Sequence, residues 1–535
     1  MTLSGNLIIG ASDVGPSAGT MRAIDPRTNT AIEPAFAFGA EAEVERAARL
    51  ADTAFDSYNA TTLAQRAAFL ERIADNLEQA APALAERASL ETGLPAPQLE
   101  AETAKTAATL RKFAAVVREG RFRAATIDPA QPERKPMPRL DHRMQKIGIG
   151  PVVVFGASNF PISYSVAGGD TASALAAGNP VIVKAHNAHP GASEIAARAI
   201  REAVRACGLH EGVFSMLRGP GNGLGESLVL HPLVRAVAFT GSEAGGMALY
   251  RLAQQRPDPI PVFAEMTSVN PTFILPGALA ARGRAIGDGF AERMLVNVGQ
   301  ACLKPALIVA VEGAGFDAMR EGLLNRISAA PARAMLTSGI HQAYLKNLAR
   351  QQEAGARRIA EGGAAHGPND GQAFLAEVDA EDFLASPALA DEVFGPTALL
   401  VRARDIGQLI QVAQSFRGQL SAAVHLEQSD HDIARGLLPI LERRTGRIVI
   451  NAFAHPQEVS YGTVHGGPFP ATTDSRFTSV GMTAIDRFLR PVTYQNLPDT
   501  LLPEALKNDN PLALWRLVDG ELTRNPIQEP DHAFA

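Results

Sequence analysis

The feature that most constrains the fold is an alternation of short β-branched runs with alanine-rich helical stretches, which begins near residue 148. The runs are PVVVF at 151–155, PVIVKA at 180–185 and VRAVAFTGS at 234–242, and helical patterns follow them at 170–178, 191–206 and from 243. Because polar and apolar residues do not alternate in these runs, we expect strands that helices cover on both faces. The chain is therefore predicted to contain a doubly wound, mainly parallel α/β sheet.

A second α/β block is predicted between residues 268 and 450, and long amphipathic helices are predicted from 40 to 120. The strand candidates of the second block are PTFIL, ALIVAVE, FLAEV, TALLVRA and RIVINAF. The segment 128–140 carries four prolines. It is predicted to be a connection or an extended excursion between elements.

Length and composition exclude several classes of protein. A chain of 535 residues is too long for one core, so two or three domains are expected. The formal net charge of −6 and the lack of a long basic run argue against a nucleic-acid partner. No apolar run approaches the ~20 residues that cross a membrane, and the first ten residues lack the pattern of a signal peptide. Two cysteines make no disulfide framework, so we expect a reducing, cytoplasmic location.

One of the two cysteines, Cys302, lies in the stretch NVGQACLKPA. Residues 287–298 are predicted to form a helix that ends at Gly299, so the cysteine would lie between a helix and a buried strand. A thiol held in such a junction loop is a candidate nucleophile if its thiolate is accessible. Cys207, at a predicted helix end, has no such setting and is expected to be structural.

Three further side chains are candidates for the same chemistry. Asn159, in the loop GASNFPIS, is placed to aim its amide at a developing oxyanion, although a loop asparagine equally often bonds its own backbone. Glu265 follows an apolar strand, where α/β proteins place chemistry, and Glu392 lies in DEVFGP. A glutamate taken at random is more often a solvated surface residue.

Six motifs, taken in order, resemble the signature of the aldehyde dehydrogenase superfamily. They are SNFP, VIVKA, FTGS, EMTSVNP, GQAC and EVFGP, between residues 158 and 396. The resemblance implies that Cys302 attacks an aldehyde, with Asn159 and the Cys302 backbone N–H as oxyanion donors. It also implies hydride transfer to a nicotinamide and hydrolysis of the thioester by water that Glu265 activates, so that the product is a carboxylic acid.

The resemblance further implies NADP or NAD as cofactor, although GPGNGLG at 219–225 does not satisfy the usual dinucleotide fingerprint. Lys184 would form a hydrogen bond with the adenosine ribose, and it is also a candidate catalytic residue. Asn187 stands where many NAD-preferring members have a glutamate, so a 2′-phosphate would not be repelled. The expected cofactor-binding residues are Phe155, Ala157, Ser158, Lys184, His186, Asn187, Phe239, Thr240, Gly241, Ser242, Gly245, Gly246, Glu392 and Phe394.

The implied architecture is α/β, with a Rossmann-like cofactor domain, an α/β catalytic domain and a small β oligomerisation element. The expected divisions are 1–127 (N-terminal helices and part of the cofactor domain), 128–147 (oligomerisation excursion), 148–267 (cofactor domain), 268–455 (catalytic domain) and 456–535 (return to the cofactor domain and oligomerisation tail). A homodimer or homotetramer is expected.

Two blocks, at 155–194 and 464–498, more specifically resemble the branch of the superfamily that oxidises 2-oxoglutarate semialdehyde, with NADP-dependent fatty aldehyde dehydrogenases as near relatives. Around the nucleophile, CLKPA departs from the usual pattern of that branch. An anionic substrate would need a cation or several donors. The candidates to bind it are Ser163, Tyr164, Ser165, Lys304 and His455.

Several alternatives remain open at the level of sequence. A thiol hydrolase or acyltransferase would also use Cys302 and Asn159, but it would not need Lys184, FTGS or Glu392. A CoA-acylating or catalytically silent member is disfavoured because Glu265 and Cys302 are both present. The two histidines of HNAH at 186–189 lack a cysteine or acidic companion, so no metal site is expected.

Overall fold

The first sheet has the strand order β11-β10-β7-β8-β9-β1-β2, and its five strands from β11 to β9 are parallel. The computed structural model describes residues 3–455 and 457–527; residues 1, 2, 456 and 528–535, which include the end of the predicted tail, lie outside the described part. The strands are β1 Leu7–Ile9, β2 Ser12–Val14, β7 Val152–Phe155, β8 Val181–Lys184, β9 Phe214–Leu217, β10 Ala236–Thr240 and β11 Val262–Glu265. The predicted parallel sheet is confirmed, and β1 and β2 add an antiparallel edge to it.

The helices around this sheet carry recognisable terminal signals. They are α1 Glu41–Asn59, α2 Leu63–Thr92, α3 Ala96–Glu119, α4 Gly169–Ala176, α5 Pro190–Ala206, α6 Gly223–Leu230 and α7 Glu243–Gln254. Helix α2 begins with a capping box between Thr62 and Gln65 and ends at Gly93 in the left-handed conformation. The Ser242 side chain accepts the Gly245 N–H and caps α7.

The second sheet has the order β15-β17-β18-β13-β12-β19-β20 and is parallel except for β15. Its strands are β12 Thr272–Ile274, β13 Leu307–Val311, β15 Arg357–Glu361, β17 Phe374–Asp379, β18 Thr397–Ala403, β19 Ala422–His425 and β20 Ile448–Ile450. Its helices are α8 Pro276–Met294, α9 Phe316–Ser328, α10 Ser338–Glu353, α11 Ala380–Ala385, α12 Ile406–Ser415 and α13 His431–Glu442. All five strand candidates of the predicted second block are therefore confirmed.

The helix predicted over 287–298 was wrong at its C-terminal end. Helix α8 stops at Met294, and a short 3-10 turn, Val296–Gly299, follows it. Asn297 and Val298 adopt left-handed backbone conformations, and the Asn297 Oδ1 accepts a hydrogen bond from Gln98 on α3 at 2.7 Å. This contact between the two halves of the molecule overrides the local helical pattern.

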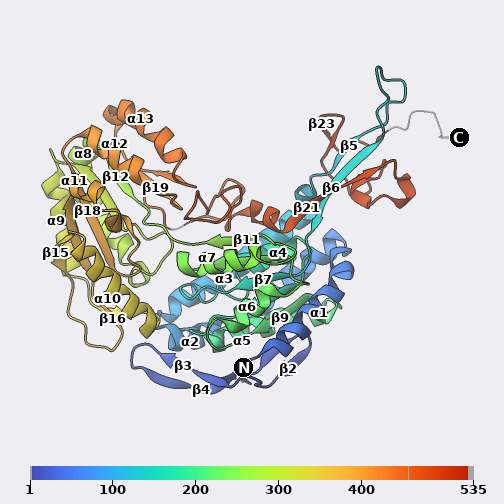
Figure 1. The fold of residues 1–535 in the computed structure, drawn as a ribbon, viewed down its shortest axis with the longest axis horizontal. Coiled ribbons are helices and arrows are strands. Elements are labelled where there is room, and N and C mark those ends of the chain that lie inside the picture. Colours follow the sequence, from blue (N-terminus) through green and yellow to red (C-terminus); the bar gives the residue numbers. More distant parts are fainter. Residues whose placement is uncertain (1–2, 456, 528–535) are drawn as a thin grey trace.

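A five-stranded arm projects from the first α/β body, on the side away from the second sheet (Figure 1). Its order is β21-β6-β5-β22-β23. The strands are β5 Thr126–Asp128, β6 His142–Gly148, β21 Leu489–Gln495, β22 Arg516–Val518 and β23 Glu521–Thr523. The proline-rich segment joins β5 to β6 as an extended excursion, in which Gln131 and Arg139 form an isolated bridge.

The remaining short elements lie outside these three sheets. Two strand pairs are β3 Thr20–Asp25 with β4 Thr30–Ala37 and β14 Arg333–Ala334 with β16 Asp370–Gly371. Other 3-10 turns are Arg121–Arg123, Glu211–Val213, Pro387–Ala390, Gln428–Asp430, Met482–Phe488, Asp499–Leu501 and Glu504–Leu506. Over residues 3–455 and 457–527, no helix has the length and apolar character needed to cross a membrane.

Candidate active site

The site lies at the carboxyl ends of the parallel strands of the first sheet. Phe155 pairs in register with Lys184 and with Phe239, and Thr240 pairs with Glu265. Adjacent parallel strands end at one edge, and such an edge is where open α/β sheets bind ligands. The expected cofactor and base residues are thereby brought to one side of the sheet.

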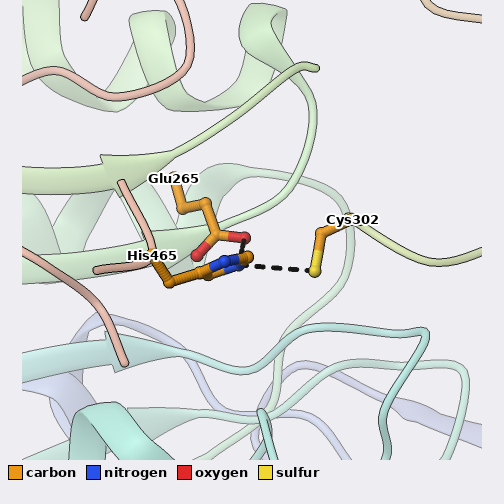
Figure 2. Close-up of side chains that lie close together, drawn as sticks. All are labelled: Glu265, Cys302 and His465. Carbon is orange, nitrogen blue, oxygen red and sulfur yellow. Dashed lines mark hydrogen bonds and ion pairs between the residues drawn. The ribbon is translucent and has the colours of Figure 1, made fainter. Parts of the chain in front are cut away.

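Cys302, Glu265 and His465 form a compact group (Figure 2). The His465 Nε2 lies 2.8 Å from the Glu265 Oε1 and 3.4 Å from the Cys302 Sγ. The three reactive atoms all lie within 4.8 Å of one another. Glu265 and His465 are both buried, so their interaction is poorly screened by water.

No role was predicted for His465, although it lies inside the block VHGGPFPATTD. It is 163 residues from Cys302 along the chain. The segment after β20 returns to the first sheet, where the Met266 N–H donates to the Ala471 carbonyl at 2.8 Å. This pairing carries the histidine to the end of β11. No local pattern signals that approach, because it depends on a long-range crossing between the two sheets.

The charges of the three groups are coupled. Burial tends to lower the pKa of His465, but Glu265 and Cys302 outweigh this effect and raise the pKa to about 10. Burial acts to raise the pKa of Glu265, yet His465 and a hydrogen bond from Ser479 bring it below its ordinary value. Burial raises the pKa of the Cys302 thiol, and His465 opposes that rise. At neutral pH the group therefore holds an imidazolium, a carboxylate and a thiol.

The cysteine loop is held in place by hydrogen bonds to its backbone carbonyls and by close packing. The Asn270 Nδ2 donates to the carbonyls of Cys302 and Lys304 at 2.8 and 2.9 Å. Gly299 has a positive φ of 67°, and a Cβ there would clash with the Gly395 carbonyl. The glycine that precedes the nucleophile is thus required by the backbone.

Asn159, predicted from the sequence as an oxyanion donor, contacts the same loop. Its Nδ2 donates to the Gln300 carbonyl at 3.1 Å, and its side chain is buried. Glu102 stabilises the loop that follows Asn159, because its Oε1 accepts hydrogen bonds from the N–H groups of Ile162 and Ser163 at 3.0 and 2.8 Å. Among the described residues, the Cys302 backbone N–H meets no acceptor. This N–H and the second Asn159 N–H are available to an oxyanion.

The proposed cofactor site contains polar side-chain atoms that lack hydrogen-bond partners. In the described part of the chain, the Lys184 ammonium has no hydrogen-bond partner, and burial lowers its pKa. The buried Asn187 Oδ1 is also without a partner, while its Nδ2 donates to the Gly219 carbonyl. Burial and two neighbouring groups lower the pKa of His186 to about 3. Its Nδ1 accepts the Ala188 N–H, so its proton is on Nε2.

The remaining predicted cofactor residues lie at the ends of β7 and β10, at the start of α7 and in the loop before β18. Phe155 and Phe239 meet edge to face with centroids 6.1 Å apart, and a Cβ on Gly241 would strike the Phe239 ring. Glu392 is reached by the Thr267 hydroxyl at 2.7 Å, and burial raises the Glu392 pKa. The other members are Ala157, Ser158, Thr240, Ser242, Gly245, Gly246 and Phe394. Orphaned polar atoms beside a helix N-terminus fit a dinucleotide.

Lys304 does not fit its predicted role as the cation for the substrate. Its side chain is only 2% exposed, and its Nζ donates to the carbonyls of Val393, Gly395 and Thr397 at 2.6, 2.9 and 3.2 Å. These three bonds use all of the ammonium protons. Lys304 instead joins the cysteine loop to the loop that carries Glu392.

The other predicted substrate residues differ in their availability. The Ser163 hydroxyl shares a hydrogen bond with Thr106 at 3.2 Å, whereas the buried Ser165 Oγ has no partner. Tyr164 and Ser163 line a pocket beside α3. Burial and nearby positive charges lower the pKa of His455 to about 4, so this histidine is neutral.

A match to the aldehyde dehydrogenase family model covers residues 14–468. The chain belongs to the aldehyde dehydrogenase family. Among curated relatives, it is 53% identical to "Alpha-ketoglutaric semialdehyde dehydrogenase 2" of Azospirillum brasilense, over 97% of this chain and 100% of that protein. It is 44% identical to "Alpha-ketoglutaric semialdehyde dehydrogenase" of Acinetobacter baylyi, over 98% of this chain and 99% of that protein. The predicted family is confirmed.

Solved structures confirm the fold of this aldehyde dehydrogenase. A 3,6-anhydro-L-galactose dehydrogenase in complex with NAP has a TM-score of 0.78 at 20% identity, covering 92% of this chain and 99% of that one. A lactaldehyde dehydrogenase has a TM-score of 0.79 at 20% identity, covering 92% and 99%. The family uses a nicotinamide cofactor. The Cys–His–Glu order also occurs in thiol hydrolases, but the family match favours the dehydrogenase.

Substitution of His465 by glutamine is expected to slow alkylation of the Cys302 thiol. The imidazolium opposes the rise of the thiol pKa, so its removal should raise that pKa further. The measurement is the rate of iodoacetamide alkylation from pH 6 to 10, followed by mass spectrometry in a Cys207→Ser background. His455→Gln, which removes a neutral ring, serves as the control; identical profiles for all three proteins would contradict the assigned charge.

Proposed function

We propose that this chain oxidises 2-oxoglutarate semialdehyde to 2-oxoglutarate with NADP or NAD. The observation that carries the chemistry is the Cys302 thiol between two oxyanion donors and the His465–Glu265 pair. The choice of aldehyde is supported by the two relatives above 40% identity that carry this substrate in their names.

The reaction has two halves: oxidation of the aldehyde to a thioester on Cys302, and hydrolysis of that thioester. Cys302 releases its thiol proton to solvent, the His465 imidazolium stabilises the thiolate, and the sulfur then bonds to the aldehyde carbon. Asn159 and the Cys302 N–H hold the resulting oxyanion of the thiohemiacetal. A nicotinamide held by Glu392 and Phe394 would supply the acceptor for the hydride of this carbon. The carbon–oxygen double bond re-forms, and the product of this half is a thioester on Cys302.

Glu265 acts in the second half as the general base. It removes a proton from water, the water oxygen bonds to the thioester carbon, and the carbon–sulfur bond breaks to release the acid and the thiol. The Ser479 hydroxyl donates to the Glu265 Oε2 at 2.6 Å, so the other oxygen is directed toward His465 and the thiol. His465 thereby orients the base as well as the nucleophile.

We also propose that NADP is accepted, because the Asn187 side chain is neutral. Lys184, Asn187 and the Nε2–H of His186 would hold the adenosine ribose and its 2′-substituent, while Glu392 and Phe394 would hold the nicotinamide end. On the division predicted from the sequence, residues 1–127 and 148–267 bind the cofactor and residues 268–455 carry the nucleophile.

Contacts between copies are assigned to the arm, through residues 128–147 and the tail from 456. The arm displays exposed apolar side chains, among them Leu517 and Leu522, which favour a homodimer or homotetramer. We propose a cytoplasmic location, because the nucleophile requires a free thiol and the cytoplasm is reducing. Both cysteines are free.

A kinetic panel tests this function. The value of kcat/KM for 2-oxoglutarate semialdehyde should exceed that for pentanal by about tenfold or more, with both NADP and NAD accepted. The Cys302, His465 and Glu265 atoms lie close enough to bind a metal ion, but the proposed reaction needs none, so EDTA should leave the rates unchanged. Equal or better use of hexanal and longer aldehydes would instead assign the chain to fatty aldehydes.

A further inference from the structure

A pocket that is open to solvent lies between α3, the loop after Asn159 and the segment that follows His465. Its walls include Lys105, Thr109, Phe113, Tyr164, Val459 and Ser479. Most of this surface is apolar, and Lys105 is the one charged side chain among its lining residues. A pocket with an apolar body and few polar groups is typical of a small-molecule site.

Two of the wall residues connect the pocket to the reacting groups. The Ser479 hydroxyl donates to the Glu265 Oε2 at 2.6 Å, so this wall touches the base directly. The reactive atoms of Glu265 and Cys302 lie within 4.8 Å of each other, and Tyr164 belongs to the loop that carries Asn159. The pocket is therefore an approach to the sulfur from the α3 side.

The Lys105 ammonium interacts electrostatically with the carboxylates of Glu102 and Glu458 but forms an ion pair with neither. Its Nζ lies 6.0 Å from the centroid of the Tyr164 ring. Within the described ranges, its ammonium forms no ion pair or hydrogen bond. An ammonium beside an aromatic ring, at the mouth of an apolar pocket, is available to an anionic ligand.

The other nearby cations are already paired or neutral. Lys112 pairs with Glu458 at 2.5 Å, and the buried Arg487 pairs with Asp170 at 2.8 Å. Lys304 is bound to backbone carbonyls, and His455 is uncharged. An anionic substrate that enters this pocket thus meets one free positive charge.

We propose that Lys105 binds the carboxylate of the anionic substrate while the aldehyde carbon of that substrate lies at the Cys302 sulfur. Lys105 would thereby determine the preference for a semialdehyde acid. The proposal rests on the proposed function. Because Lys105 is exposed, the pairing is partly screened by solvent, and its effect should be moderate and should weaken with salt.

The test compares two five-carbon aldehydes, 2-oxoglutarate semialdehyde and pentanal, on full-length variants. Lys105→Met should raise KM for the semialdehyde about tenfold, with kcat within about twofold, and should leave pentanal kinetics within about twofold. Lys105→Arg should retain the wild-type preference, since it keeps the charge. Added NaCl should raise KM for the semialdehyde in the wild type but not in Lys105→Met.

Lys346→Met is the matched control, because Lys346 is an exposed lysine on α10, outside the pocket. It should match the wild type with both aldehydes. If the wild type prefers the semialdehyde and Lys105→Met keeps that preference, the role of Lys105 is overturned while the proposed function stands. If the wild type prefers pentanal, the proposed function itself fails. Equal losses with both aldehydes in Lys105→Met would show a structural role and also overturn the proposal.

Discussion

Replacing Cys302 by alanine is expected to lower aldehyde oxidation by a factor on the order of 10⁴ or more, because no covalent intermediate can form. The oxyanion donors and the Glu265–His465 pair remain, so the substrate pocket is preserved. Steady-state production of reduced cofactor is the measurement. NADP affinity, measured by fluorescence titration, should be nearly unchanged because the alanine lies outside the predicted cofactor residues.

Cys207→Ala is the matched control for this experiment. Cys207 follows α5, and burial raises the pKa of its thiol. It should retain the full rate of oxidation, since the thiol takes no part in the site. Turnover by Cys302→Ala near the wild-type rate would show that the sulfur is not the nucleophile.

Replacing Glu265 by glutamine should separate the two halves of the reaction. An amide cannot take a proton from water at neutral pH, so thioester hydrolysis should slow by about 10²-fold or more. Hydride transfer precedes that step and should still occur once per site. Stopped-flow absorbance should show a burst of reduced cofactor followed by a slow steady rate.

A linear time course without a burst would contradict this order of steps. The matched control is Glu243→Gln, at the first turn of α7, where the carboxylate pairs with Arg417 on the surface. It should show the wild-type time course. A burst in that variant would mean that the assay detects something other than loss of the base.

Much of the architecture was predictable because it follows from local patterns. Strands such as β13 and β18 are continuous apolar runs, and a buried parallel strand requires such a run. The end of α8 was not predictable, because the left-handed Asn297 is stabilised by Gln98, a residue distant in sequence. Element type is local, whereas this boundary depends on tertiary contact.

The same distinction applies to the site. Cys302, Glu265 and Asn159 stand in recognisable motifs, and the structure brings them together. His465 was missed, because its approach to Cys302 depends on the pairing of Ala471 with the end of β11. Lys304 was misassigned, because nearness to Cys302 in sequence does not fix the direction of a side chain that finds three carbonyls elsewhere.

The most direct test of covalent oxidation on Cys302 is the mass of the intermediate. Glu265→Gln protein is mixed with 2-oxoglutarate semialdehyde and NADP, quenched in acid and analysed by peptide mass spectrometry. A thioester adds the mass of the aldehyde less two hydrogen atoms, whereas a thiohemiacetal adds the whole aldehyde. We expect the thioester mass on the peptide that contains Cys302, and only when cofactor is present. An unmodified Cys302 peptide during the burst, or an adduct on Cys207, would contradict the account.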